Sequence, residues 1–129
     1  MSDQFNFELI SPEKMIFSTS ANEVILPSYE GQMTILKDHI PIITFLRPGI
    51  IEINPTTEKK KYFIEDGTIE FFNNKLLVLT QNAKDIDNFQ EDEISAMIEE
   101  NDALIKKNNL SDKERYVLSY KIETLKSIK

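Results

Sequence analysis

Residues 59–80, KKKYFIEDGTIEFFNNKLLVLT, hold three apolar runs separated by two short polar pairs. Asp66-Gly67 lies between the first and second runs, and Asn73-Asn74 lies between the second and third. Gly and Asn tolerate the positive φ angles that tight hairpin turns require. The segment therefore predicts consecutive antiparallel strands joined by two hairpins.

The same pattern of short strands extends back to the start of the chain. In FNFELI (residues 5–10), Phe5, Phe7 and Leu9 alternate with Asn6 and Glu8, as expected when one face of a strand is buried. Further short runs of this kind are MIFS (15–18), NEVILP (22–27), MTIL (33–36) and GIIEI (49–53). No helical pattern separates these runs, so an all-β antiparallel sandwich or barrel is predicted rather than a parallel α/β sheet.

After Asp85 the apolar period becomes helical. Asn88 and Glu91 have the spacing of a capping box, and Ser111 and Glu114 repeat that spacing. The apolar stripes that follow each box are Ile94, Met97, Ile98, Leu104 and Ile105 in the first helix, and Leu118, Ile122 and Leu125 in the second. These patterns predict a β-sandwich domain over residues 1–86 and a C-terminal α-helical hairpin over residues 87–129.

Charge divides the predicted hairpin. Residues 88–108 carry six acids and two bases, net −4, whereas residues 111–129 carry three acids and five bases, net +2. In one interpretation these are two solvated helix faces whose opposite charges pair with each other. In the other, the second helix leaves the first and binds an acidic partner, because a two-helix hairpin buries little apolar area by itself.

Composition excludes several classes of protein. The net charge of −7 over 129 residues argues against general nucleic-acid binding, which requires basic patches. No cysteine is present, so thiolate metal sites and disulfides are excluded. There is no run of about 18 apolar residues, and the N-terminus lacks the features of a secretory signal. We expect a protein of the bacterial cytoplasm.

Catalysis finds little support in the sequence. His39 is the single histidine, and the nearest candidate partners are Thr34, Asp38 and Thr44. Neighbouring residues of an extended segment point to opposite faces, which is poor geometry for a proton relay. No metal or cofactor site is predicted, because the chain lacks a metal-binding cluster and a glycine-rich phosphate loop. An interaction module is favoured; a free-standing adaptor or ligand-binding sandwich and a small hydrolase stay as alternatives.

The order of residues in three further stretches is more specific. They are LISPEKMIFS (9–18), ANEVILPSYEGQMTILKDHIPIITFLRPGIIEI (21–53) and YFIEDGTIEFFNNKLLVLTQNA (62–83). This order resembles the epsilon subunit family of bacterial F-type ATP synthases, the counterpart of the mitochondrial delta subunit. The resemblance covers nearly the whole chain. It implies a β-sandwich followed by two helices, in agreement with the pattern above.

The resemblance also implies a function. Such a protein is a non-catalytic central-stalk rotor subunit that turns with the gamma subunit on the c-subunit ring and couples proton translocation to ATP synthesis. It is peripheral at the cytoplasmic face of the inner membrane and reaches the membrane only through the complex. The matching contact residues toward gamma and the c ring are Glu30, Gly31, Gln32 and His39. Gln32 replaces an acid that is frequent in the family, so one expected charge pair is lost.

The hairpin is the regulatory part in this family. In some members it extends along gamma and its basic last helix contacts the catalytic alpha and beta subunits, which blocks ATP hydrolysis. The matching candidates for contact with the beta subunit are Arg115, Lys121 and Lys126. Some members also bind ATP at the start of the first helix. In the corresponding stretch EDEISA (91–96), Ser95 replaces the arginine that would bind phosphate, so weak or absent ATP binding is predicted.

Overall fold

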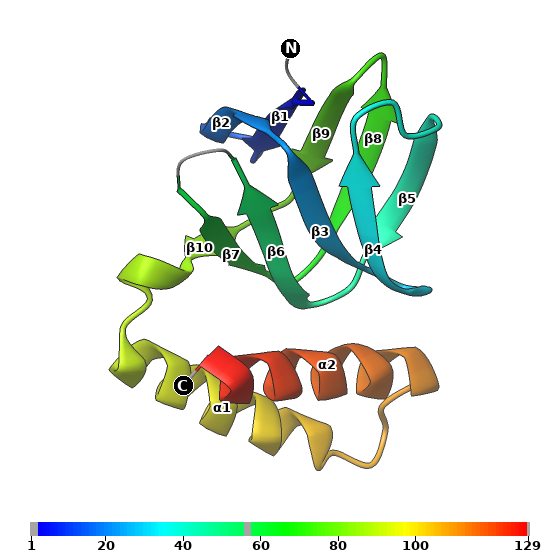
Figure 1. Ribbon diagram of the computed structural model, residues 1–129. Helices are drawn as coiled ribbons and strands as arrows, with labels where there is room; N and C mark the ends of the chain where they lie inside the picture. The colour runs from blue at the N-terminus through cyan, green and yellow to red at the C-terminus, as the bar shows by residue number, and fades with distance from the viewer. Residues whose placement is uncertain (1–2, 56–57, 129) are drawn as a thin grey trace.

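The structure, a computed structural model, describes residues 3–55 and 58–128 and consists of strands followed by helices (Figure 1). The strands are β1 (Phe5–Ile10), β2 (Met15–Ala21), β3 (Glu23–Ser28), β4 (Gly31–Leu36), β5 (Ile42–Leu46), β6 (Gly49–Asn54), β7 (Lys60–Ile64), β8 (Gly67–Phe72), β9 (Lys75–Leu79) and β10 (Ala83–Asp85). The helical elements are the 3₁₀-helix η1 (Ile86–Asn88), α1 (Glu91–Ile105) and α2 (Asp112–Ile128). The predicted fold class, a sandwich followed by a helical hairpin, is confirmed.

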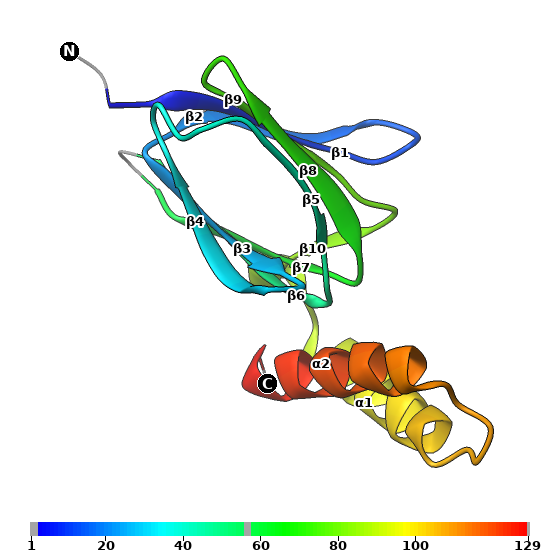
Figure 2. The same cartoon turned by 90° about the vertical axis from the view of Figure 1, so that its right-hand side faces the viewer.

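Two layers make up the sandwich, as Figure 2 shows in edge view. One layer has the strand order β10-β7-β6-β3-β4, and the other has the order β5-β8-β9-β1-β2. Only the pair Ser28 and Leu46 links β3 to β5 and thereby joins the layers into one continuous sheet. Alternate side chains fill the space between the layers, since Phe7, Val24 and Val78 are fully buried while their strand neighbours are more exposed.

One of the two predicted hairpins in residues 59–80 is confirmed. Asn73 and Asn74 have φ angles of 50° and 56° and join β8 to its antiparallel neighbour β9. The prediction at Asp66-Gly67 is wrong, because β7 pairs with β6 and β10 whereas β8 pairs with β5 and β9. The chain crosses there from one layer to the other. Gly67 is needed for close packing instead, since a Cβ atom would lie 2.9 Å from the carbonyl oxygen of Leu79.

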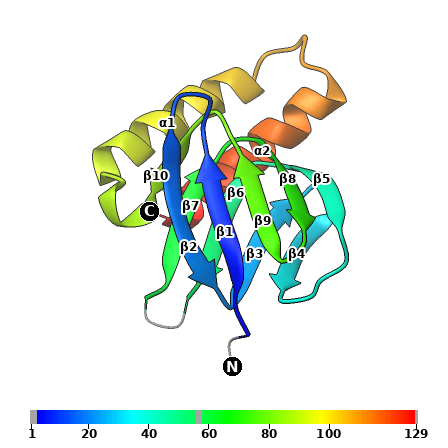
Figure 3. The ribbon, with the colours of Figure 1, turned by 90° about the horizontal axis from the view of Figure 1, so that it is seen from above.

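The sandwich departs from a purely antiparallel arrangement at one place. β1 runs parallel to β9, with Phe7 opposite Leu76 and Leu9 opposite Val78, and antiparallel to β2. Parallel neighbours need a long connection, which the intervening strands provide. Figure 3 shows β1 between β2 and β9.

The start of the first helix differs from the prediction. Asn88 closes η1 instead of capping α1, and Gln90 is the N-cap of α1, without a side-chain hydrogen bond. The Asn88–Glu91 capping box is therefore wrong: the extra 3₁₀ turn, capped by Asp85, uses the residues before the α-helix. The second box is confirmed, because the Ser111 N–H donates to Glu114 Oε1 (2.9 Å) and the Glu114 N–H donates to Ser111 Oγ (3.1 Å).

The two helices pack against each other beside one end of the sandwich (Figures 1 and 2). Their predicted mutual charge pairing is wrong: among the described residues, no ion pair joins α1 to α2. The hairpin's ion pairs are instead made with the sandwich, from Lys84 to Glu93 (2.8 Å) and from Lys121 to Glu65. One acid of α1 and one base of α2 are thus paired with the sandwich, and most of the other charged side chains of the two helices are exposed.

Candidate interaction surfaces

The β3–β4 turn presents the first predicted contact residues. Gly31 has a φ of 124°, a conformation that disfavours any residue with a Cβ atom. Ser28 Oγ donates to the Gly31 carbonyl (2.6 Å) and fixes the shape of the turn. Glu30 and Gln32 are exposed at its tip. The turn is thus rigid and able to present polar groups to a partner.

His39 lies at the other end of β4, so the structure does not bring it together with the turn. Its imidazole Nδ1 is 2.6 Å from the Ile40 carbonyl oxygen, and its ring meets the buried Phe71 edge-on at 5.8 Å. Asp38, which has a φ of 66°, is held by Asn74: the Asp38 N–H donates to Asn74 Oδ1 (2.7 Å), and Asn74 Nδ2 donates to Asp38 Oδ1 (2.9 Å). These contacts make His39 part of a braced loop.

In the part of the chain that the structure describes, no cluster of catalytic side chains surrounds the His39 imidazole. Its contacts, given above, are with a carbonyl and an aromatic ring. Within residues 3–55 and 58–128, no three acidic or histidine side chains gather closely enough to hold a metal ion. In the same ranges, neither helix has the length and apolarity that crossing a bilayer requires.

An apolar face, defined here as the outward side chains of Ile43, Phe45, Phe72 and Leu79, covers the outside of β5, β8 and β9. Their exposed fractions are 73%, 65%, 58% and 45%. Strand register places these side chains on one side of the sheet, with Thr68 between Phe45 and Leu79 and with Glu70 opposite Ile43. Exposed apolar area of this kind marks interaction sites in soluble proteins. The sequence analysis missed this face, although the run IITFL (42–46) is apolar at nearly every position and so has apolar side chains on both sides of its strand.

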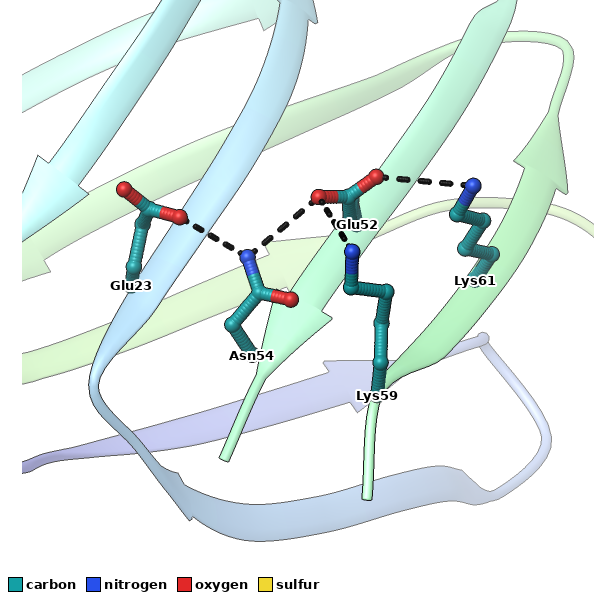
Figure 4. Close-up of polar contacts among 5 residues, drawn as sticks. All are labelled: Glu23, Glu52, Asn54, Lys59 and Lys61. Atoms are coloured by element: carbon teal, nitrogen blue, oxygen red, sulfur yellow. Dashed lines mark hydrogen bonds and ion pairs between the residues drawn. The ribbon is translucent and has the colours of Figure 1, made fainter. Parts of the chain in front are cut away.

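The layer that contains β3, β6 and β7 has a polar network on its outer surface. Asn54 Nδ2 donates to Glu23 (2.8 Å) and to Glu52 (3.3 Å), and Lys59 and Lys61 approach Glu52 at 3.5 and 3.6 Å (Figure 4). Burial raises the pKa of Glu52, but Asn54 and the two lysines outweigh burial and hold it below its usual range. These side chains satisfy one another's hydrogen bonds and charges across β3, β6 and β7. The network therefore stabilises the sheet, and we do not assign it a binding role.

An open groove of 1070 Å³ adjoins the apolar face and extends toward α2. Phe45, Leu46 and Leu79 contribute apolar walls, and Glu30 and Lys113 contribute charges from the turn and from α2. The β3–β4 turn, the apolar face and the hairpin therefore border a single concave region.

The hairpin packs on the outer side of β6 and β7 at one end of these strands through a second apolar cluster, defined by Phe63, Phe89, Ile94 and Leu125. The rings of Phe63 and Phe89 are 5.8 Å apart, and Leu125 is fully buried. Burial of such side chains stabilises packing by roughly 1.5–3 kcal/mol each before ordering is counted. The hairpin is thus docked on the sandwich in this structure.

The three basic residues predicted to contact a catalytic subunit occupy different environments. Arg115 donates to the Ile105 carbonyl (3.0 Å) and the Lys107 carbonyl (2.9 Å), and so caps the C-terminal end of α1. Lys121 pairs with Glu65 of the sandwich and is 19% exposed. Lys126 is exposed. In the docked hairpin, Arg115 and Lys126 are both exposed, although the Arg115 guanidinium is already engaged at the end of α1.

Comparisons with known proteins agree with this architecture. The family model described as the ATP synthase delta/epsilon chain beta-sandwich domain matches residues 4–86. The chain belongs to this family. An ATP synthase epsilon chain of Pelagibacter ubique is 40% identical over 129 residues, which is 99% of both chains. One from Rhizobium johnstonii is 34% identical over 100 residues, covering 77% of this chain and 74% of the relative.

Two solved structures share the family fold. A chain in the mitochondrial ATP synthase of Euglena gracilis superposes with a TM-score of 0.80 at 19% identity, over 98% of this chain and 82% of that one. A chain in the central stalk and c-ring assembly of Tetrahymena thermophila gives a TM-score of 0.66 at 14% identity, over 95% and 93%. The arrangement of sandwich and hairpin is therefore shared by proteins of very different sequence.

Proposed function

We propose that this protein is a non-catalytic rotor subunit in the central stalk of an F-type ATP synthase, coupling ion movement through the c ring to ATP synthesis. The observation that carries the proposal is membership of the delta/epsilon family, supported by a relative 40% identical over the full chain. The absence of a catalytic cluster around His39 in the described residues is consistent with it. In this role the protein sits peripherally at the cytoplasmic face of the inner membrane, held there by the complex.

The apolar face is the proposed docking surface for the gamma subunit. Ile43 and Phe45 lie on β5, exposed and without cover, and interface cores are built from such side chains. The β3–β4 turn, with Glu30, Gly31 and Gln32, is proposed to contact the polar loops of the c ring. His39, at the far end of β4, belongs with the gamma contact, because the apolar face continues toward it through Ile40, which is 73% exposed.

The hairpin is proposed to inhibit ATP hydrolysis when it leaves the sandwich and reaches the catalytic subunits. Release would free Lys121 from Glu65 and add it to Arg115 and Lys126 as a basic surface for an acidic segment of the beta subunit. Deleting residues 88–129 should then raise hydrolysis by the assembled enzyme. Unchanged hydrolysis would reject the inhibitory role.

The experiment that tests the proposed assembly is affinity purification of the tagged full chain from its native membrane. Gamma and c subunits are expected to accompany it. Replacing Ile43 and Phe45 by Ser should abolish recovery of gamma, whereas Met15→Ser, at the opposite edge of the same layer and 47% exposed, should not. A chain that purifies alone, or a double variant that retains gamma, contradicts the proposal.

A further inference from the structure

A row of three tyrosine rings ending in one guanidinium joins α2 to two loops of the sandwich. The Tyr29 ring stacks on the Tyr116 ring at 5.7 Å with 18° between the ring planes, and Tyr116 contacts Tyr120 at 4.8 Å. The guanidinium of Arg47 lies 4.0 Å from the centre of the Tyr120 ring. We infer that these four side chains form a latch that holds the hairpin docked, and that Arg47 is its key residue.

The geometry of α2 explains why the two tyrosines act together. Tyr116 and Tyr120 are four residues apart, so they share one face of the helix. The cluster residue Leu125 reaches the sandwich further along α2, where it packs with Phe63. The latch therefore holds the first half of α2 and the apolar cluster holds the second half.

The sandwich side of the latch is rigid. The Arg47 N–H donates to the Pro27 carbonyl (2.9 Å), which ties the loop after β5 to the strand that leads into Tyr29. Arg47 Nη1 donates to the Pro48 carbonyl (3.1 Å), which orients the guanidinium over the ring. Tyr116 Oη also donates to the Tyr29 carbonyl (3.3 Å). Because these loops are already fixed, Tyr29 and Arg47 are in position for Tyr116 and Tyr120 before α2 docks. Docking then costs little additional loss of conformational freedom on the sandwich side.

The chemistry of the latch differs from that of the rest of the interface. A cation over an aromatic face and a pair of stacked rings each contribute modestly, and the cation contributes more when it is shielded from water. Arg47 is partly buried, and Tyr120 covers its guanidinium. Removing either contact is expected to shift the ratio of released to docked hairpin by about tenfold. This inference concerns contacts within the chain and does not require the proposed partners.

The latch can be tested by thiol labelling, because the chain has no cysteine of its own. Ile50→Cys places a thiol on β6 beside the apolar cluster, at a partly buried position that packs against it. Lys61→Cys, exposed on the neighbouring strand β7, gives the labelling rate of an open site. The ratio of the two rates increases with the fraction of chains whose hairpin has released. All variants are compared in the Ile50→Cys background of the full chain.

Arg47→Gln and Tyr120→Ala are each expected to raise the labelling rate about tenfold. The double variant should label no faster than Tyr120→Ala alone, because the contact that Arg47→Gln removes is already lost when the Tyr120 ring is absent. Tyr116→Ala should raise the rate similarly, and Tyr116→Phe, which keeps the ring stack, should raise it less. Glu123→Gln, exposed on α2, should leave the rate unchanged.

The inference is overturned if Arg47→Gln leaves the rate unchanged, or if Arg47→Gln and Tyr120→Ala multiply each other's effects. Loss of folding is recognised separately, since it would raise labelling of a thiol in the sandwich core as well. Leu76→Cys, fully buried in that core, serves as this reporter. If a variant raises labelling of the thiol under the hairpin but not of the thiol at position 76, the hairpin has been released from a folded sandwich. The effect is then assigned to the latch.

Discussion

Two phenylalanines of similar burial offer a direct test of how independent the hairpin is. Phe71 is 1% exposed in the core between the two layers, where it contacts Phe5 and His39. Phe63 is 2% exposed but belongs to the cluster beneath the hairpin. The chemical change Phe→Ala is the same at both positions, so any difference in effect comes from what covers the ring.

At position 71 the expected loss in the free energy of unfolding is about 3–5 kcal/mol, because the core cannot close around the cavity. At position 63 the hairpin can leave. Once it has left, residue 63 is a surface position, where substitutions change stability by about 0.5 kcal/mol or less. Phe63→Ala should therefore release the hairpin while the sandwich keeps nearly all of its own stability.

The assay follows amide NMR signals of β8 and of α2 separately through a urea titration, with limited proteolysis of the native state as a second measurement. Phe71→Ala should lower the midpoint of the β8 signals strongly. Phe63→Ala should leave that midpoint almost unchanged and make α1 and α2 open to protease in the absence of urea. Equal losses at both positions, with strand and helix signals moving together, would show that the molecule unfolds as one unit and would refute the reasoning.

Three further predictions concern local features. Gly31→Ala should lower stability by about 1–3 kcal/mol through backbone strain alone, since no atom lies near enough to clash; a melting temperature measures it, and an unchanged value would contradict the assigned φ. A hydrogen bond from Lys84 holds the pKa of Glu93 below 4.5, so its contribution to docking is present above pH 4.5 and is lost as the pH falls through the lowered value. Protease sensitivity of the hairpin should rise in that range, and less so in Glu93→Gln, which has already lost the charge. Ser111→Ala removes the cap of α2 and should lower the stability of that helix by about 1 kcal/mol. Circular dichroism should then show reduced helicity; an unchanged spectrum would mean that the capping box contributes nothing.

Short sequence motifs correctly predicted the turns and helix caps that depend only on neighbouring residues. Asn73-Asn74 and Ser111–Glu114 were predicted correctly, because positive φ angles and capping hydrogen bonds involve residues only a few positions apart. The pair Asp66-Gly67 carries an equally strong turn signal, yet it joins strands in different layers. Strand partners are chosen by packing across the whole domain, which no turn dipeptide encodes.

The same distinction applies to the site. Three of the contact residues that the resemblance implied, Glu30, Gly31 and Gln32, lie together at the β3–β4 turn. The separation of His39 from that turn depends on β4 lying between them, and the apolar face depends on which side of β5 is covered. The sequence analysis assigned no role to Arg47. Its position over Tyr120, 73 residues away in the chain, arises from docking alone.

The parallel pairing of β1 with β9 has a consequence for synthesis on the ribosome. The first strand to emerge waits for residues 75–79 before it gains its second neighbour. Until then β1 and β2 form an isolated ribbon with an open edge, and such edges invite association with other nascent chains. Closure of the sandwich should therefore be a late, slow event, dominated by contacts between distant parts of the chain.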